Sequence, residues 1–213
     1  FDDFNLQSHL ASVDASHDLG IFEIGGAYRF AHSRLGGDSF LTLNQFSPSI
    51  ARFFGDNLYV RGEYTYTDRN FIGRTDRDGK SNAAAGDAYY FMNGARTYFA
   101  AGYRYEKETT VDPQFDFKGD TFRARFSQRF PAGSRDGHLR VGYRYEIRDY
   151  SSITPSIGAL REDKRHRFNA ELEVPLGKAL FARLNAEYGD FQSNLPAADF
   201  NQTVVSARLG LRF

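Results

Sequence analysis

The chain has 213 residues, and 27 lysine and arginine residues balance 27 aspartate and glutamate residues. The zero net charge argues against a basic surface for nucleic acid. The absence of cysteine excludes disulfides, thiolate nucleophiles and cysteine-based zinc sites. The longest apolar run, Ala88 to Met92, is far short of the roughly 20 residues of a membrane-spanning helix. A membrane β-barrel is compatible with this composition, because its strands alternate between apolar and polar residues.

Alternation with a period of two runs through the whole chain, and helical periodicity is nearly absent. It predicts about eleven strands. They are 4–17, 20–34, 39–54, 58–72, 82–92, 97–110, 118–130, 138–151, 164–175, 179–192 and 201–213. Several exceed the 5–6 residues usual for globular strands and suit the roughly 9–11 residues of a tilted membrane strand.

The connectors between these segments alternate in length. The short ones are 18–20, 55–57, 93–96 and 177–178, with 131–137 somewhat longer. The longer, polar ones are 73–81, 111–117, 152–163 and 193–200, and 36–38 is a short exception among them. Short turns on one side and long loops on the other are typical of outer-membrane barrels.

A soluble β-sandwich would also alternate, with its apolar face turned inward. Strand length, loop asymmetry and the large mixed charges of the polar face together favour the membrane barrel. We therefore predict an antiparallel transmembrane β-barrel of about 10–12 strands, with residues 1–213 as a single domain. The expected location is the bacterial outer membrane, where the barrel contacts lipid and lipopolysaccharide.

The C-terminal strand resembles the recognition signal of proteobacterial outer-membrane barrels. That signal ends in phenylalanine, with apolar residues at alternate positions before it. Leu209, Leu211 and Phe213 match this spacing, as do Val205 and Ala207. The resemblance implies that the barrel assembly machinery is a partner during insertion, reading the segment as an edge strand.

A series of short motifs extends the likeness over much of the chain. The motifs are Arg77-Asp78-Gly79, Tyr89-Tyr90-Phe91, Gly102-Tyr103-Arg104-Tyr105-Glu106, Phe115-Asp116-Phe117, Gly142-Tyr143-Arg144-Tyr145, Arg148-Asp149-Tyr150, Arg161-Glu162-Asp163, Pro175-Leu176 and Ser193-Asn194. The series resembles the C-terminal barrels attached to periplasmic tetratricopeptide-repeat domains, as in the surface lipoprotein assembly modifier family and related exporters. The resemblance implies a pore module for export, with a periplasmic repeat domain or exporter as partner. No helical repeat precedes the barrel in this sequence.

Tyrosines at alternate positions of 102–106 and 142–146 are expected to face lipid, with the hydroxyl among the headgroups. Residues of the opposite parity are expected to line the lumen. They are Glu23, Arg29, Arg61, Glu63, Arg104, Glu106, Arg123, Arg125, Arg140, Arg144, Glu146, Arg148, Arg167, Glu171, Glu173, Arg183, Glu187, Arg208 and Arg212. Interleaved signs, such as Glu171 and Glu173 beside Arg183, favour a ladder of ion pairs. A surplus of arginine in 118–148 keeps an anion-preferring pore as the alternative.

We expect no enzymatic activity, cofactor or metal site. The histidines (His9, His17, His32, His138 and His166) are scattered, and no serine, histidine and acid can be placed together by spacing. Acidic residues in or beside loops, among them Asp76, Asp78, Asp112, Asp116 and Asp120, lack a full calcium-loop pattern. Solvated turns are the favoured interpretation of these acids.

Three functions fit a barrel of this kind. The first is the pore module of an exporter that carries polypeptide or polysaccharide to the surface. The second is a diffusion porin with arginine-rich walls and a weak preference for anions. The third is a non-conducting barrel that anchors a partner.

Strand parity leads to one more expectation, since a bacterial barrel normally has an even number of strands. Either segment 1–17 is not a lipid-facing strand, because His9, Asp14 and His17 break its alternation, or residues before Phe1 supply missing strands. We favour the second. The chain opens directly on Phe1, so a cleaved or upstream segment is expected in any case.

Overall fold

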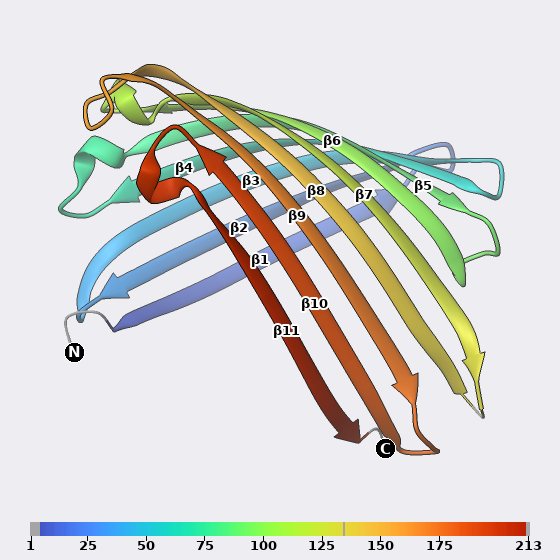
Figure 1. Ribbon diagram of the computed structural model, residues 1–213. Helices are drawn as coiled ribbons and strands as arrows, with labels where there is room; N and C mark the ends of the chain where they lie inside the picture. Colours follow the sequence, from blue (N-terminus) through green and yellow to red (C-terminus); the bar gives the residue numbers. More distant parts are fainter. Residues whose placement is uncertain (1–4, 134, 212–213) are drawn as a thin grey trace.

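The computed structural model describes residues 5–133 and 135–211. Eleven strands form one sheet in these ranges, each antiparallel to the next in chain order (Figure 1). They are β1 (Leu6–Asp18), β2 (Glu23–Leu35), β3 (Asp38–Phe54), β4 (Leu58–Phe71), β5 (Gly79–Phe91), β6 (Thr97–Thr110), β7 (Phe117–Ala132), β8 (Arg135–Thr154), β9 (Ala159–Pro175), β10 (Leu180–Ser193) and β11 (Phe200–Leu211). The all-β prediction and the expected number of strands are confirmed. No helix within the described ranges is long and apolar enough to cross a membrane.

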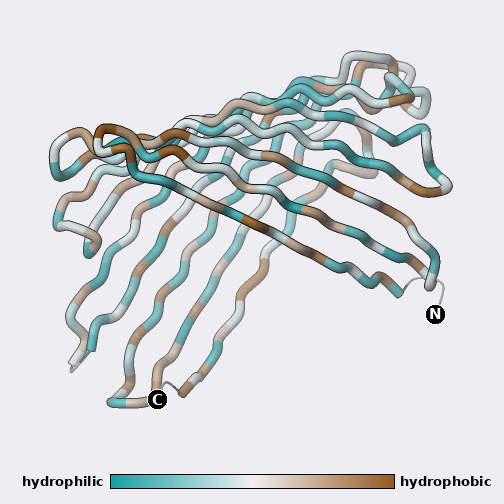
Figure 2. The backbone as a smooth tube through the Cα atoms, turned by 180° about the vertical axis from the view of Figure 1, so that it is seen from behind, coloured by the Kyte–Doolittle hydropathy of each residue, from teal (hydrophilic) through white to brown (hydrophobic). Residues whose placement is uncertain are grey.

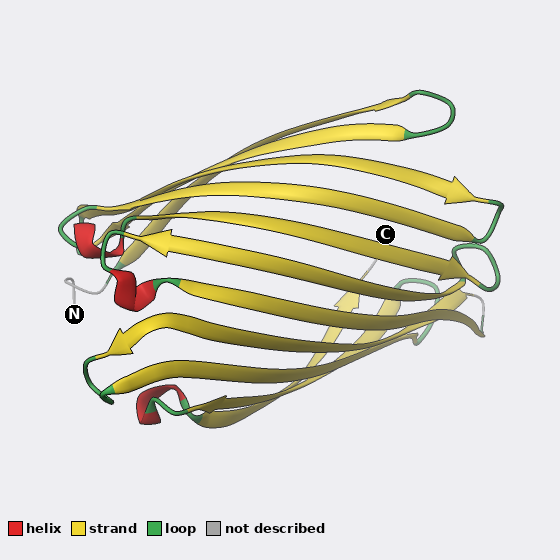
Figure 3. Cartoon of the chain, turned by 90° about the horizontal axis from the view of Figure 1, so that it is seen from above, coloured by secondary structure: helices red, strands yellow, loops and turns green. Residues whose placement is uncertain are grey.

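The sheet curves strongly, so it has a concave and a convex face (Figures 1 and 3). Side chains alternate between these faces because successive Cβ atoms of a strand point to opposite sides. Leu184 of β10 lies opposite Leu172 of β9 and Ala207 of β11, and such apolar rows cover the convex face. Along each strand, polar and apolar residues follow one another closely (Figure 2).

The connectors separate into a turn end and a loop end. The loop end carries three short 3₁₀ helices: η2 (Thr75–Arg77), η3 (Pro113–Phe115) and η4 (Pro196–Ala198). The turn end carries the tight connections, for example at Gly55, whose φ of 61° favours glycine. This asymmetry agrees with the expected alternation of short and long connectors.

The expectation of a long loop at 152–163 was wrong. β8 continues to Thr154 and β9 begins at Ala159, so residues 155–158 alone form the turn. The register shifts between Asp149 and Ile153, and this irregularity interrupts the alternation on which the sequence prediction depended. At the other end of β8, the connector is also shorter than the expected 131–137, because β7 reaches Ala132 and β8 starts at Arg135.

The first and last strands are free edges of the sheet. β1 pairs with β2 from Leu6–Leu35 to Asp18–Glu23, so β1 belongs to the sheet, and the alternative that segment 1–17 is not a lipid-facing strand and leaves ten true strands was wrong. Among the described residues β1 and β11 do not pair with each other, and they cross obliquely in Figures 1 and 2. Val13 and Val205 are 71% and 73% exposed, against 45% for Val141 in the middle of the sheet.

Candidate functional site: the ionic inner wall

Small polar side chains form the floor of the concave face. Ser47, Thr65, Thr67, Ser81, Thr121 and Ser127 are all buried there, whereas Ala51, Ala83 and Phe117 are the buried apolar residues of the described chain. The inner wall is therefore a polar surface between charged side chains, and no hydrophobic core fills it.

The strand register places the residues expected to line the lumen on this concave face. They are Glu23, Arg29, Arg61, Glu63, Arg104, Glu106, Arg123, Arg125, Arg140, Arg144, Glu146, Arg148, Arg167, Glu171, Glu173, Arg183, Glu187 and Arg208. Leu209 and Leu211 of the expected assembly signal lie on the convex face, in the rows of Ala182 and Leu180. Arg212 and Phe213 lie outside the described residues.

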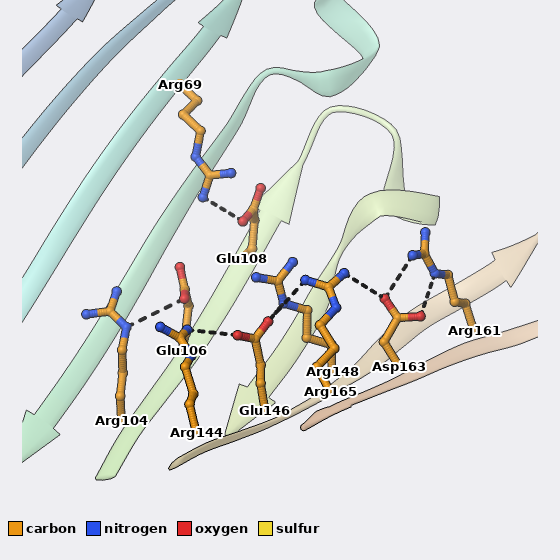
Figure 4. A network of polar contacts seen from close by, with 10 residues as sticks. All are labelled: Arg69, Arg104, Glu106, Glu108, Arg144, Glu146, Arg148, Arg161, Asp163 and Arg165. Atoms are coloured by element: carbon orange, nitrogen blue, oxygen red, sulfur yellow. Dashed lines mark hydrogen bonds and ion pairs between the residues drawn. The ribbon is translucent and has the colours of Figure 1, made fainter. Parts of the chain in front are cut away.

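Glu146 of β8 is the centre of the largest charge cluster. Its carboxylate lies 2.8 Å from Arg144 Nη2, 2.9 Å from Arg148 Nε and 3.4 Å from Arg165 Nη1, and the residue is 5% exposed (Figure 4). A carboxylate out of contact with water needs such partners, because burial of an unpaired charge is costly. The cluster ties the middle strands β8 and β9 together.

Asp163 of β9 extends this cluster toward the loop end. Arg161 binds it through two nitrogens, at 2.9 Å and 2.8 Å, and Arg165 Nη2 lies 3.4 Å away. The Ser193 hydroxyl on β10 donates to it at 2.7 Å, and Asp163 is 1% exposed. Because 152–163 was expected to be a loop, Asp163 and Arg161 were missing from the expected set, and Arg165, in the expected strand 164–175, was not included in it either. Their alternate spacing at 161, 163 and 165 was the available signal.

Two ion pairs reach across an intervening strand. Arg123 Nη2 on β7 lies 3.0 Å from Asp87 Oδ2 on β5, over Gly102 of β6. Arg69 Nη2 on β4 lies 2.7 Å from Glu108 Oε2 on β6. Asp87, Arg69 and Glu108 were also absent from the expected set, although Arg69 shares the parity of Arg61 and Glu108 that of Arg104.

Further ion pairs continue the ladder on both sides of the cluster. Arg61 pairs with Glu63 at 2.8 Å, Arg104 with Glu106 at 3.6 Å and Arg140 with Glu171 at 2.8 Å. Arg183 of β10 pairs with Glu173 of β9. The side chains of these pairs are partly exposed, so each pair contributes little on its own, about 0–1 kcal/mol.

Positive charge is concentrated at the middle of the wall. Arg123, Arg144 and Arg167 occupy directly opposed positions on β7, β8 and β9. Arg125 lies beside them and has no ion pair with any described residue. Together with Gly102 and Gly142, Arg123, Arg125 and Arg144 line a hollow of about 270 Å³. This arginine row (Arg123, Arg144, Arg167 and Arg125) offers donors to anionic groups that pass along the wall.

The acidic residues of the loop end brace turns. Asp78 Oδ1 accepts from the backbone N–H of Phe71 at 2.6 Å. Asp116 Oδ1 accepts from the backbone N–H of Thr110 at 2.5 Å and from its hydroxyl at 2.7 Å. Asp112 accepts from the backbone N–H of Gln114 at the start of η3. Residues 5–133 and 135–211 contain no group of three or more potential metal ligands.

The model of one protein family, the surface lipoprotein assembly modifiers, matches residues 16–213. No curated protein matches the chain by sequence.

Several solved outer-membrane proteins share the fold. A loop L8 deletion mutant of OmpT from Vibrio cholerae is 13% identical with a TM-score of 0.61, and the match covers 94% of this chain and 62% of that one. OccAB3 from Acinetobacter baumannii is 14% identical with a TM-score of 0.55, over 94% and 55% of the two chains. The alcaligin outer-membrane receptor FauA from Bordetella pertussis is 12% identical with a TM-score of 0.50, over 99% and 37%. This chain thus spans less than two thirds of the length of each of these proteins.

Proposed function

Because this chain belongs to the surface lipoprotein assembly modifier family and is an outer-membrane β-barrel protein, we propose that it forms the wall of a route by which surface lipoproteins cross the outer membrane. Family membership associates the chain with surface lipoproteins. The finer claim, that polypeptide moves along the concave face, is the proposal.

The continuous ionic lining of the concave face is the observation that supports this route. From Arg61 on β4 to Arg208 on β11, paired charges and buried hydroxyls alternate with glycine and alanine. An extended polypeptide carries a polar group at every peptide bond, so it loses less hydration beside such a surface than beside an apolar one. In this function the wall positions the cargo and keeps it hydrated, and it forms no covalent bond with the cargo.

A diffusion porin is the second candidate, and the arginine row is the observation that favours it. Arg125 has no ion pair with a described residue, and Arg144 faces an arginine on each side. Such a row attracts small anions as readily as acidic side chains. A porin would therefore show a weak preference for anions and no effect on lipoprotein display.

The proposal is tested in a strain from which the complete parent gene has been deleted. A lipoprotein that the intact strain displays is followed by protease treatment of whole cells and by antibody labelling. We expect the lipoprotein to be made and lipidated in the deletion strain but to be protected from protease, and the complete gene to restore its exposure. Display that is unchanged by the deletion would contradict export.

The control separates a missing route from a disturbed membrane. An unrelated outer-membrane barrel and total lipoprotein are quantified in the same cells, and both should stay constant. Solute uptake is measured in parallel. Reduced uptake of small anions with normal display would identify the porin, and no change in either would identify the non-conducting barrel.

A further inference from the structure

Tyrosine hydroxyls mark a common level on the convex face. Four tyrosines donate to, or share a hydrogen bond with, a polar side chain on the neighbouring strand. These bonds are Tyr28 to Asn44 at 2.6 Å, Tyr64 to Asn82 at 2.5 Å, Tyr103 to Asp120, and Tyr143 with His166 at 2.9 Å. In each case the polar residue lies nearer the loop end than the residue directly opposite the tyrosine. Tyrosines with the ring in lipid and the hydroxyl outside it are typical of a membrane interface.

Lysines gather on the convex face at and beyond this level. The register places Lys80 on β5, Lys107 on β6 and Lys118 on β7, all exposed near the loop end. Lys164 lies on the same face of β9, opposite Ile147. Of the five lysines in the sequence only Lys178 lies elsewhere, at the turn end.

None of these lysines forms an ion pair with a described residue, whereas most arginines of the wall do. Every ion pair among the described residues uses an arginine. Asp68 lies opposite Lys80 and Asp149 lies opposite Lys118, while Asp120, two residues along β7 from Lys118, accepts from Tyr103. None of these acids forms an ion pair with a lysine, so the ammonium groups keep their charge available.

Lys107 and Lys118 are directly opposed in the register, with Asn82 on the far side of Lys107. Directly opposed residues have Cβ atoms about 5 Å apart, and like charges in such pairs repel. The repulsion is stronger beside lipid, where water screens charge poorly. An anionic group seated between the two ammonium groups would convert this repulsion into attraction.

We propose that Lys80, Lys107 and Lys118 form a binding site for the phosphate groups of lipopolysaccharide. The site lies on the face that contacts lipid, just beyond the level of the tyrosine hydroxyls, which is the depth of a phosphorylated headgroup. Ammonium groups bind phosphate as compact point charges. The glycolipid occupies the outer leaflet, so the site also places the loop end on the cell surface.

The test compares the lipopolysaccharide retained by the wild type with that retained by a double variant, each as the full-length protein purified from outer membranes. The variant carries Lys107→Gln and Lys118→Gln, and native mass spectrometry counts the lipopolysaccharide bound to each barrel. Since a basic residue near an anionic lipid surface contributes about a factor of five, we expect roughly 25-fold weaker binding. Purified lipopolysaccharide and the same glycolipid stripped of phosphate are then added back, and only the phosphorylated form should bind the wild type.

The matched control removes two cations at the turn end, Arg135→Gln with Lys178→Gln, and should retain lipid as the wild type does. Heat-dependent mobility in detergent gels shows that each variant is folded. Equal retention by both double variants, or equal binding of phosphate-free glycolipid, would overturn the site. Equal competition by phosphatidylglycerol vesicles would overturn the assignment to lipopolysaccharide.

Discussion

The carboxylate of Asp87 and the guanidinium of Arg123 bond across a whole strand, at 3.0 Å from Oδ2 to Nη2. The strand between them, β6, contributes Gly102 at this point of the register. A Cβ added at Gly102 would overlap the Asp87 carboxylate and come within 2.8 Å of Arg123 Nε. The missing side chain is therefore what allows the pair to form.

Gly102→Ala is expected to break this pair. The methyl group displaces the carboxylate, and the misfit costs roughly 1–2 kcal/mol of unfolding free energy. Gly86→Ala is the matched control, because a Cβ at Gly86 on the neighbouring strand meets nothing within 4 Å. Urea unfolding of the protein in lipid vesicles measures both, and an equal effect of the two substitutions would contradict the expectation.

Glu146→Gln is expected to destabilise the barrel by roughly 2–4 kcal/mol, because three arginines lose their shared, buried carboxylate. Glu63→Gln removes a carboxylate with one ion-pair partner, the half-exposed Arg61, and one hydroxyl donor, Thr65, and should cost less than about 1 kcal/mol. The same vesicle unfolding experiment compares the two variants. Similar losses would mean that water screens the Glu146 cluster as well as it screens the Glu63 pair.

Leu184→Arg and Asn185→Arg place the same charge on opposite faces of β10. Leu184 lies on the convex face between Leu172 and Ala207, so arginine there should cost roughly 2–4 kcal/mol in a bilayer. Asn185 lies on the polar concave face, where the cost should be below about 1 kcal/mol. The free energy of folding into vesicles checks the difference, and equal costs would contradict the assignment of the convex face to lipid.

The orientation of the barrel can be read with single cysteines, since the chain contains none of its own. Cysteine at Ser156, in the exposed turn at the loop end, should react with a membrane-impermeant maleimide on intact cells. Cysteine at Asp56, exposed at the turn end, should react only after the outer membrane is opened. Under this orientation loops 73–81, 111–117 and 193–200 are extracellular as well, and the reverse labelling pattern would invert it.

How the barrel closes can be tested at the two free edges of the sheet, β1 and β11. Because ten reversals separate them, β1 and β11 run in the same direction, and an all-antiparallel closure needs an odd number of further strands between them. We therefore expect no disulfide between cysteines at Val13 and Val205 in the full-length protein. Cysteines at Leu184 and Ala207, which are directly opposed, should oxidise readily as the positive control. A rapid Val13–Val205 crosslink would show that the two edges meet.

Alternation by itself determined which face each residue occupies. In a strand the side-chain direction depends only on parity, so Leu184 and Asn185 could be assigned to opposite faces without coordinates. The same reasoning identified the strands and the asymmetry of the connectors. The family likeness, the all-β fold and the outer-membrane location were also readable from the residues and their motifs, and all are confirmed.

The partners of each charge were decided only by the tertiary structure. Whether Asp87 meets Arg123, or how many arginines reach Glu146, depends on the register of three neighbouring strands. That register is set by the turns between them, whose lengths the sequence pattern places only within a few residues. The hairpin around Asp163 was missed for a related reason. The register shift between Asp149 and Ile153 interrupts the alternation of β8, and the hydrogen bond from Ser193 to Asp163 forms only once β9 and β10 lie side by side.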